Sequence, residues 1–579
     1  MCGIVGIASR NKVSSREVIE MLKRLEYRGY DSFGYANIEG TCEKFIGRID
    51  GKKITDIGSK VSICHTRWST HGGVTKANSH PHNDCSGNIF VIHNGIIENY
   101  LQIKEDMIKK GHRFKSQTDT EIIAHYFEEY IKSLPIEKVV ETFFKEAKGE
   151  FAILLIIKDD NKIYAFKRGS PLVLGVGKGK NILASDIYAF SNITDDVIFF
   201  NEDEFAIVED SNYTFYKIDP KLKPVKKDVV KIQWAQKEET KEEYDHYMIK
   251  EIKEQPEAVK RLLTSLQYEQ KNNLDSLKKM IKTSKRVVFI AAGSSYHASL
   301  LGVSFLNKVG IETHTSIASE FKTFNLIDDN TLVIAISQSG ETMDVIEALR
   351  GIKQKGVKIA SLVNVPYSTI QRMSNVSINI QAGQERCVAA TKTFTNQVLT
   401  LAYLAHLFGY EFNVNNIPEK IESIFDQEDH IKKLAKKLKY KKDIYIIGRG
   451  YVYPIAREIA LKLKEIAYIH AEGMMGGELK HGTLALIEDG VPVISLIPKE
   501  DRSIISNTKE VEARGGYIIP ITNNPEINYP DKFIVKTDYE LHFCIMSSIV
   551  GQLLTYYTAK EKNLPIDMPR NLAKSVTVK

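Results

Sequence analysis

Short apolar runs alternate with polar loops over about the first 210 residues of the chain. The runs have the length of strands and are rich in β-branched and aromatic residues. The clearest runs are 4–8, 89–93, 151–157 and 197–200. Two segments, about 15–28 and 97–110, instead carry apolar residues at helical spacing. The pattern predicts an α+β domain built in layers.

A different pattern begins near residue 285, where apolar strands alternate with helical segments. The predicted strands are 286–292, 331–336 and 358–363. Such alternation predicts a parallel sheet with helices on both faces. A polar stretch rich in Lys and Glu, residues 216–245, separates the two patterns and is the predicted linker.

A weak internal repeat lies within this second half. The sequence KRVVFIAAGSSY at 285–296 aligns with KDIYIIGRGY at 442–451, and a further apolar run follows each copy at a similar spacing. We therefore predict two homologous α/β subdomains, 275–415 and 432–570.

The composition is typical of a soluble globular enzyme. Hydrophobic residues make up 43% and charged residues 26% of the 579 residues, a length that suits several domains. The net charge of +6 comes from 79 basic and 73 acidic residues with no basic arm, so nucleic acid is not an expected partner. No apolar run reaches the length of a membrane span and no signal-peptide pattern is present, so we predict a cytoplasmic protein.

The second residue, Cys2, is a candidate nucleophile. Removal of Met1 would leave a free α-amine, with a reference pKa of about 8, beside the thiol, where it can act as the base. By itself this thiol is weak evidence, because the chain has 6 cysteines without a C-x-x-C pair and most suit small core positions.

Polar residues are dense in the segments that follow, at 64–72, 78–82 and 93–95. Loops with this many donors at strand ends are typical of functional sites. The segments contain His65, His71, His80, His82 and His93. None of these histidines forms a helical i,i+4 pair or a Glu-flanked zinc motif, so we predict no metal.

Two charged residues could hold an amino acid by its ends. Arg67 suits bidentate binding of a carboxylate, and Asp119 suits an ammonium group. For either residue alone, a surface ion pair is the simpler interpretation.

Five motifs in this half, 2–6, 26–32, 66–72, 93–95 and 118–121, closely resemble those of class II glutamine amidotransferase domains. The resemblance implies an N-terminal nucleophile hydrolase fold, a four-layer αββα sandwich over residues 2–215. It also implies that Cys2 attacks the glutamine carboxamide, while the Asn94 side chain and the Gly95 N–H form the oxyanion hole. The implied glutamine-binding residues are Arg28, near the nucleophile, Arg67, Trp68, which would gate the exit of ammonia, Thr70, His71 and Asp119.

In the second half, two predicted strands end in hydroxyl-rich turns, 293–296 and 337–342. Glycines, hydroxyls and N–H groups at a helix start are what a phosphate needs, although ordinary helix caps would explain one such turn. Neither a P-loop nor a G-x-G-x-x-G motif is present, so a small phosphorylated ligand is the better prediction.

A helix predicted over 454–469 carries an apolar stripe. At about 100° per residue, Lys462 falls within this stripe, Glu465 on its flank and Lys464 on the far side. A Lys and a Glu at a buried boundary form either a structural pair or a site.

This half resembles the tandem sugar isomerase modules of the glutamine:fructose-6-phosphate amidotransferase, or glucosamine-6-phosphate synthase, family. The matching stretches are 247–256, 318–321, 337–342, 461–472, 477–482 and 574–578. The resemblance implies two doubly wound, parallel-sheet α/β subdomains and a catalytic tail, 571–579. It implies conversion of fructose 6-phosphate and glutamine to glucosamine 6-phosphate and glutamate, the first step of hexosamine synthesis, with internal transfer of ammonia.

The resemblance also implies roles for individual residues. His481, supplied by the partner subunit of a homodimer, would assist ring opening. Lys574 would form the Schiff base, and Glu465 would move the proton between C1 and C2. The implied sugar-phosphate residues are Ser294, Ser295, Ser337, Gln338, Ser339, Thr342, Val388 and Lys462. No cofactor is implied.

The chain departs from the family at a few positions. Arg386 and Cys387 replace small or apolar residues, Ala390 replaces a Ser, and the chain ends in Lys579 where Glu is common. These departures bear on the sugar contacts around Val388.

Two other functions fit parts of the pattern. An amidotransferase acting on phosphoribosyl pyrophosphate would need a phosphoribosyltransferase loop, which the sequence does not contain. A regulator that senses sugar phosphates would not need Glu465, His481 and Lys574, and no DNA-binding segment is apparent.

Overall fold

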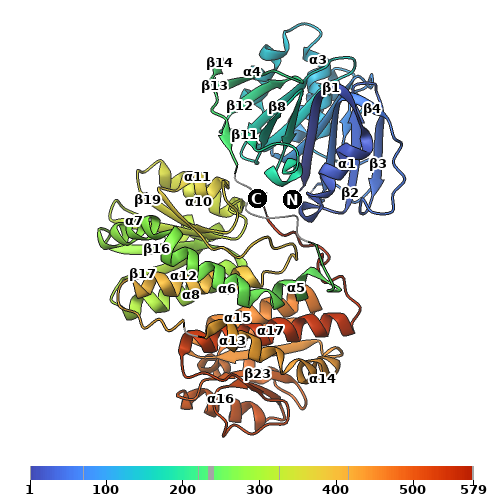
Figure 1. Cartoon of the computed structure of the whole chain (residues 1–579). Helices are drawn as coiled ribbons and strands as arrows, with labels where there is room; N and C mark the ends of the chain where they lie inside the picture. The colour runs from blue at the N-terminus through green and yellow to red at the C-terminus, as the bar shows by residue number, and fades with distance from the viewer. Residues whose placement is uncertain are drawn as a thin grey trace. The chain divides into compact units, whose positions relative to one another are not determined.

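The computed structural model describes residues 2–69, 71–219, 221–232, 240–324, 327–414 and 416–576 (Figure 1). The described residues up to Ile232 form one compact unit, and those from Thr240 to Lys574 form a second.

The N-terminal unit contains two antiparallel sheets. The larger sheet has the strand order β15 (Val230–Lys231), β11 (Asp196–Phe199), β9 (Val173–Gly177), β10 (Lys180–Ala184), β1 (Gly3–Ser14), β4 (Gly58–Arg67), β2 (Ser32–Asn37), β3 (Cys42–Ile46). The smaller sheet has the order β14 (Lys221–Val225), β13 (Tyr213–Asp219), β12 (Glu204–Val208), β8 (Ile163–Arg168), β7 (Gly149–Ile157), β6 (Ile89–Ile97), β5 (His82–Asn83).

Alternating apolar residues build the layers of this unit. On β6 and β7, Ile92 and Leu154 belong to a core that also contains residues of the larger sheet, such as Ile63. Their neighbours Val91 and Ile153 belong to a second core with the helices. Because successive side chains of a strand point to opposite faces, a strand that is apolar throughout is covered on both sides.

Helices cover the outer faces of the two sheets. Helix α1 (Ser15–Lys23) packs on β1 and β4 of the larger sheet. The smaller sheet shares its outer core with α2 (Tyr100–Lys109), α3 (Glu121–Tyr130) and α4 (Ile136–Glu146). The predicted four-layer αββα sandwich is therefore confirmed (Figure 1).

Helix α3 was not among the helices that the sequence predicts. Its residues 121–127 are all buried, although its polar residues Glu121, His125 and Glu128 recur at the i, i+4, i+7 spacing of a helix. The predicted linker 216–245 also differs from the structure, because β13, β14 and β15 continue the sheets as far as Lys231. Lys221, Lys223 and Lys231 lie on the short edge strands β14 and β15, where charge discourages pairing with other chains.

The second unit contains two parallel sheets of the same topology. The first has the order β17 (Thr313–Ile317), β16 (Arg286–Ala291), β18 (Thr331–Ser337), β19 (Lys358–Val363), β20 (Val376–Asn379). The second has the order β22 (His470–Met475), β21 (Asp443–Gly448), β23 (Pro492–Ile497), β24 (Tyr517–Thr522), β25 (Phe533–Ile534). Both follow the doubly wound order 2-1-3-4-5, so the predicted repeat of two α/β subdomains is confirmed.

Helices of the second unit cover both sheets and join them through one apolar core. The helices are α5 (Tyr247–Lys253), α6 (Gln255–Thr264), α7 (Lys271–Lys282), α8 (Gly293–Lys308), α9 (Phe321–Phe324), α10 (Met343–Lys353), α11 (Thr369–Met373), α12 (Lys392–His406), α13 (Ile417–Phe425), α14 (Glu428–Leu438), α15 (Tyr453–Lys462), α16 (Arg502–Glu512) and α17 (Glu540–Glu561). Helix α17 is buried along most of its length. Within the described residues, no helix is both long and apolar enough to cross a membrane.

Strand β22 packs very closely on helix α15, and Gly473 makes this possible. A Cβ atom at Gly473 would lie 2.4 Å from the backbone oxygen of Ala456. We expect Gly473→Ala to lower the free energy of unfolding of this unit by about 1–3 kcal/mol, because backbone must move. Gly351→Ala on α10 is the control, since its nearest heavy atom lies 4.0 Å away. Equal urea midpoints for the two variants would contradict the prediction.

Candidate active sites

A cavity in the N-terminal unit collects most of the residues predicted to handle glutamine. Its walls come mainly from the start of β1, the end of β4, strand β6 and the loop before α3. Its lining is Cys2, Arg67, Trp68, His71, His80, His93, Gly95, Thr118, Asp119 and Thr120. Six of these residues were predicted for the site. Of the other four, His93, Thr118 and Thr120 lie in the same sequence motifs, and His80 lies in the polar segment 78–82.

The Cys2 thiol is fixed by the backbone of Trp68. The Trp68 N–H donates to Cys2 Sγ at 3.3 Å, and the thiol lies 3.6 Å from the Trp68 carbonyl oxygen. Burial raises the pKa of the thiol, and the Trp68 N–H works against this shift. The Cys2 side chain is therefore oriented before any substrate arrives.

Asn94 is held in one orientation by a buried histidine. Its Nδ2 donates to the Cys2 carbonyl oxygen at 2.8 Å, and its Oδ1 lies 3.0 Å from His65 Nε2. Burial lowers the pKa of His65 to about 3, so the ring is neutral. Because His65 Nε2 also faces the carbonyl oxygen of His93, at 3.1 Å, this nitrogen must carry the hydrogen. The Asn94 amide N–H groups consequently point to the Cys2 side.

Gly95 occupies a position that excludes other residues. Its φ is +123°, and a Cβ atom would lie 2.0 Å from the backbone oxygen of Glu150 on β7. This close approach of two paired strands requires glycine. The Gly95 backbone is thereby presented to the cavity.

Arg67 and Asp119 are both buried rather than paired on the surface. The Arg67 guanidinium donates to Ser69 Oγ at 2.9 Å and to the carbonyl oxygens of the loop 71–73. Asp119 Oδ2 accepts the Ile97 N–H at 2.8 Å. The alternative interpretation of each as a solvated ion pair is therefore wrong, because these groups line the cavity and hold its loops.

Arg28 is not among the residues that line this cavity. Its buried guanidinium pairs with Asp186, and the Tyr27 hydroxyl donates to the same carboxylate at 2.8 Å. A buried arginine requires a carboxylate partner, and Asp186 supplies it, while the expected position of Arg28 near the nucleophile stays a prediction. Thr70 lies outside the described residues.

The two hydroxyl-rich turns of the second unit lie on neighbouring strands. Ser294 and Ser295 begin α8 directly after β16, and the turn from Ser337 to Thr342 joins β18 to α10. In the order 2-1-3-4-5 these two strands flank the point where the chain direction reverses, the usual ligand crevice of this topology. Gly340 has a φ of +64°, a backbone conformation that favours glycine, and its N–H donates to Ser337 Oγ at 3.0 Å.

Glu458 connects the first of these turns to helix α15. Its carboxylate accepts the Ser294 hydroxyl at 2.8 Å and lies 2.8 Å from His297 Nδ1. Glu458 is buried and was not predicted as a site residue. Its position one helical turn before Lys462 is the sequence signal that could have identified it.

Lys462 lies between two carboxylates on the same helix face. Its Nζ is 2.6 Å from Glu465 Oε2 and 3.4 Å from Glu458 Oε1. Burial would lower the pKa of Lys462, but Glu465 and Glu458 together raise it above its usual value. Lys464 is exposed, as the helical periodicity predicts.

Lys574 forms a buried ion pair with Glu385. The Lys574 side chain is only 4% exposed, so it is not the solvated charge that its place near the chain end suggests. Glu385 Oε2 also accepts the Thr393 hydroxyl at 2.7 Å, and its other oxygen accepts the Thr391 N–H at 2.9 Å. Glu385 directly precedes Arg386 in the sequence and was not predicted as a site residue.

The departures from the family surround this ion pair. The Cys387 N–H donates to Glu251 Oε1 at 3.1 Å, and the Cys387 side chain is buried. The Arg386 guanidinium bonds the Tyr247 hydroxyl at 3.1 Å. The Val388 N–H donates to the Asp567 carbonyl oxygen at 3.0 Å, which joins this loop to the segment before Lys574. Lys579 lies outside the described residues.

His481 is exposed at the end of a short 3₁₀ turn, Gly476–His481. The exposure of this ring leaves it available to another molecule.

Comparisons with known proteins agree with both halves. A glutamine amidotransferase domain model matches residues 1–244, and a SIS domain model matches 280–407 and 437–560. A glutamine–fructose-6-phosphate aminotransferase (isomerizing) of Thermococcus kodakarensis is 40% identical, with 100% of each chain covered. One from Clostridium tetani is 38% identical over the same coverage. The chain belongs to this aminotransferase family.

A solved structure supports the assignment of the second unit. The C-terminal domain of glucosamine-fructose-6-phosphate aminotransferase from Francisella tularensis is 33% identical, with a TM-score of 0.52. The match covers 57% of this chain and 100% of that domain. The family therefore accounts for both the glutamine amidotransferase domain and the two SIS domains.

The carboxyl of Glu251 generates a prediction about stability and pH. Burial, and then the nearby Glu385 charge, raise its pKa from 4.5 to about 8. Between these two values the folded chain keeps a proton on Glu251 that the unfolded chain has released. The contribution of the protonated carboxyl to stability is therefore complete below about pH 4.5 and is lost as the pH rises to about 8.

We expect Glu251→Gln to reduce this loss of stability by roughly a few kcal/mol between about pH 5 and pH 8. Urea unfolding at both pH values measures it. Glu257→Gln, an exposed carboxyl on α6, is the control. A pH dependence in Glu251→Gln identical to that of the wild type would disprove the assignment.

Proposed function

We propose that this enzyme converts fructose 6-phosphate and glutamine to glucosamine 6-phosphate and glutamate. The observation that carries the proposal is the pair of assembled sites in one chain: the Cys2 cavity with Arg67 and Asp119, and the buried Lys574–Glu385 pair. The substrates are those named for the relatives at about 40% identity.

In the glutaminase reaction, Cys2 Sγ attacks the carboxamide carbon of glutamine. The amine freed by removal of Met1 takes the thiol proton and passes it to the amide nitrogen of the tetrahedral adduct. The adduct then releases ammonia and leaves a thioester, which water hydrolyses to glutamate. Two donors stabilise the oxyanion, the Asn94 amide and the Gly95 N–H. Two features support these roles: the orientation of Asn94 by His65, and the glycine-only backbone at Gly95.

Arg67, His71 and Asp119 would hold the glutamine backbone, with Trp68 next to the nucleophile, and Thr70 stays a prediction. Arg28 would act at a distance by fixing the segment that carries it to Asp186. Ammonia would pass to the second site without release into solvent.

At the second site, the sugar phosphate would bind at the two hydroxyl-rich turns. The proposed ligands are Ser294, Ser295, Ser337, Gln338, Ser339 and Thr342, with Val388 supplying backbone. Two helix starts, those of α8 and α10, direct N–H groups to this crevice and favour an anion there.

Lys574 would form the Schiff base with C2 of the opened sugar. Its amine must first lose a proton, and the Glu385 carboxylate bonded to it is the nearest acceptor. Glu465 would transfer the proton between C1 and C2, and Lys462 fixes the position of its carboxylate. We further propose a cytoplasmic homodimer in which His481 of one subunit assists ring opening in the other.

Substitutions at the two sites should affect the glutamine-dependent and the sugar-dependent steps separately. Cys2→Ala should lower glutamine-dependent product formation by about 10⁴-fold or more, and yet leave synthesis from added ammonia. Lys574→Arg should abolish product formation from either nitrogen source while glutamine hydrolysis continues. Product analysis with amide-labelled glutamine measures both activities.

The matched controls for these two variants are Cys42→Ala and Lys560→Ala, a half-buried thiol and an exposed amine outside both sites. A Cys2→Ala enzyme with normal glutamine-dependent turnover would overturn the proposal.

The role of His481 across a subunit interface can be tested by mixing inactive variants. His481→Ala and Lys574→Arg chains, refolded together at equal amounts, should recover about one quarter of the wild-type activity, since half of the dimers gain one intact site. Each variant refolded alone is the control. If His481 acts within its own chain, every mixed site keeps one defect and no activity returns.

A further inference from the structure

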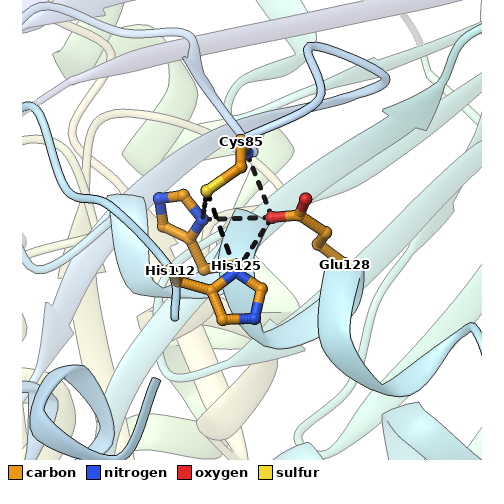
Figure 2. Close-up of side chains that lie close together, drawn as sticks. All are labelled: Cys85, His112, His125 and Glu128. Carbon is orange, nitrogen blue, oxygen red and sulfur yellow. Dashed lines mark hydrogen bonds and ion pairs between the residues drawn. The ribbon is translucent and has the colours of Figure 1, made fainter. Parts of the chain in front are cut away.

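A second cluster of reactive side chains lies in the N-terminal unit, outside the Cys2 cavity. Cys85, His112, His125 and Glu128 converge from two loops and helix α3 (Figure 2). One ligand atom from each residue lies within 4.8 Å of the other three. The proposed glutaminase chemistry uses none of these residues. The prediction that no metal is bound concerned the five histidines around the cavity, which do not include His112 and His125.

We propose that these four side chains form a structural binding site for a zinc ion. The ligands would be Cys85 Sγ, His112 Nδ1, His125 Nδ1 and a Glu128 carboxylate oxygen. Thiolate, imidazole and carboxylate together are a typical zinc donor set, and four protein ligands leave no open position for catalysis.

Four of the six distances between the donor atoms match a tetrahedral ion. With zinc–sulfur bonds of about 2.3 Å and zinc–nitrogen bonds of about 2.0–2.1 Å, a tetrahedron separates sulfur from nitrogen by about 3.6 Å. Cys85 Sγ lies 3.6 Å from His125 Nδ1 and 3.9 Å from His112 Nδ1. For nitrogen and oxygen ligands the same geometry gives about 3.3 Å. Glu128 Oε2 lies 3.0 Å from His112 Nδ1 and 3.3 Å from His125 Nδ1.

The surroundings of the cluster are those of an ordered metal site. Each histidine turns Nδ1 to the centre and Nε2 to an outer carboxylate, with His112 Nε2 3.2 Å from Glu129 and His125 Nε2 3.7 Å from Glu121. A hydrogen bond to an outer carboxylate, as from His112 to Glu129, fixes the tautomer and strengthens the ring as a ligand, whereas Glu121 lies beyond hydrogen-bonding distance of His125 and acts through its charge. The Arg113 N–H also donates to Cys85 Sγ at 3.4 Å, which favours a thiolate.

Burial and charge also favour a bound cation. The His112 and His125 side chains are 5% and 1% exposed, and three carboxylates and one thiol surround them. A divalent ion would balance the Cys85 thiolate and the Glu128 carboxylate, and both rings would stay neutral. The competing interpretation is a hydrogen-bonded cluster in which the histidines donate to Glu128 without a metal.

The position of the site suggests its purpose. Glu121 to Glu128 lie on α3, and the residues just before this helix, Thr118 to Thr120, line the Cys2 cavity. A zinc ion would tie α3 to the loops that carry Cys85 and His112. It would stabilise the N-terminal unit and keep Asp119 in place.

Metal binding to the full-length chain tests the proposal. Protein stripped with a chelator and titrated with Zn²⁺ against a chromophoric chelator should bind one equivalent. Co²⁺ in its place should give the visible bands of a tetrahedral ion and a thiolate-to-cobalt charge-transfer band. Zn²⁺ should also raise the Tm of the stripped protein.

The variants separate this site from other ligands. Cys85→Ser should weaken Zn²⁺ binding by at least about 100-fold and remove the charge-transfer band, and Glu121→Gln should weaken binding by about 10–100-fold. Cys42→Ser is the matched control, and Cys2→Ala should also keep the full equivalent of metal. Binding well below one equivalent, or binding unchanged in Cys85→Ser, would overturn the proposal. If Cys85→Ser does not fold, the cobalt spectrum of the wild type still decides.

Discussion

Polar and charged groups that are removed from water must be given partners by the protein, and this constraint organises each candidate site in the chain. Glu385 is buried, and it is stable there because Lys574, the Thr393 hydroxyl and the Thr391 N–H replace the lost hydration. The tail that carries Lys574 is held in place by the same contacts. The amine proposed to form the Schiff base is thus positioned by the same group that is proposed to accept its proton.

The same constraint fixes the N-terminal site. His65 is buried and neutral, so its single ring hydrogen must serve two acceptors, and this decides which way the Asn94 amide faces. Arg67 satisfies its donors with carbonyl oxygens of the loop that follows it, and so shapes the wall of the cavity. In both cases the hydrogen bonds that stabilise the fold also pre-organise the proposed chemistry.

The proposed zinc site extends this logic to helix α3. Its first turns pack on the smaller sheet and its preceding residues line the cavity, while His125 and Glu128 face a cluster with more negative than positive side chains. A metal ion would balance that charge. The helix would then be anchored by apolar packing on one face and by metal ligation on the other.

The sequence by itself determined the elements with a clear period and the sites with a local motif. Alternating β and α patterns predicted the two parallel sheets, and the stripe on α15 separated the buried Lys462 from the exposed Lys464, because each signal depends only on neighbours in the chain. Cys2, Arg67, Gly95 and Asp119 were likewise found from motifs. The tertiary structure decided what depends on distant partners. It revealed the burial of Lys574 against Glu385, the pairing of Arg28 with Asp186, and the meeting of Cys85 with His125, whose partners lie tens to hundreds of residues apart.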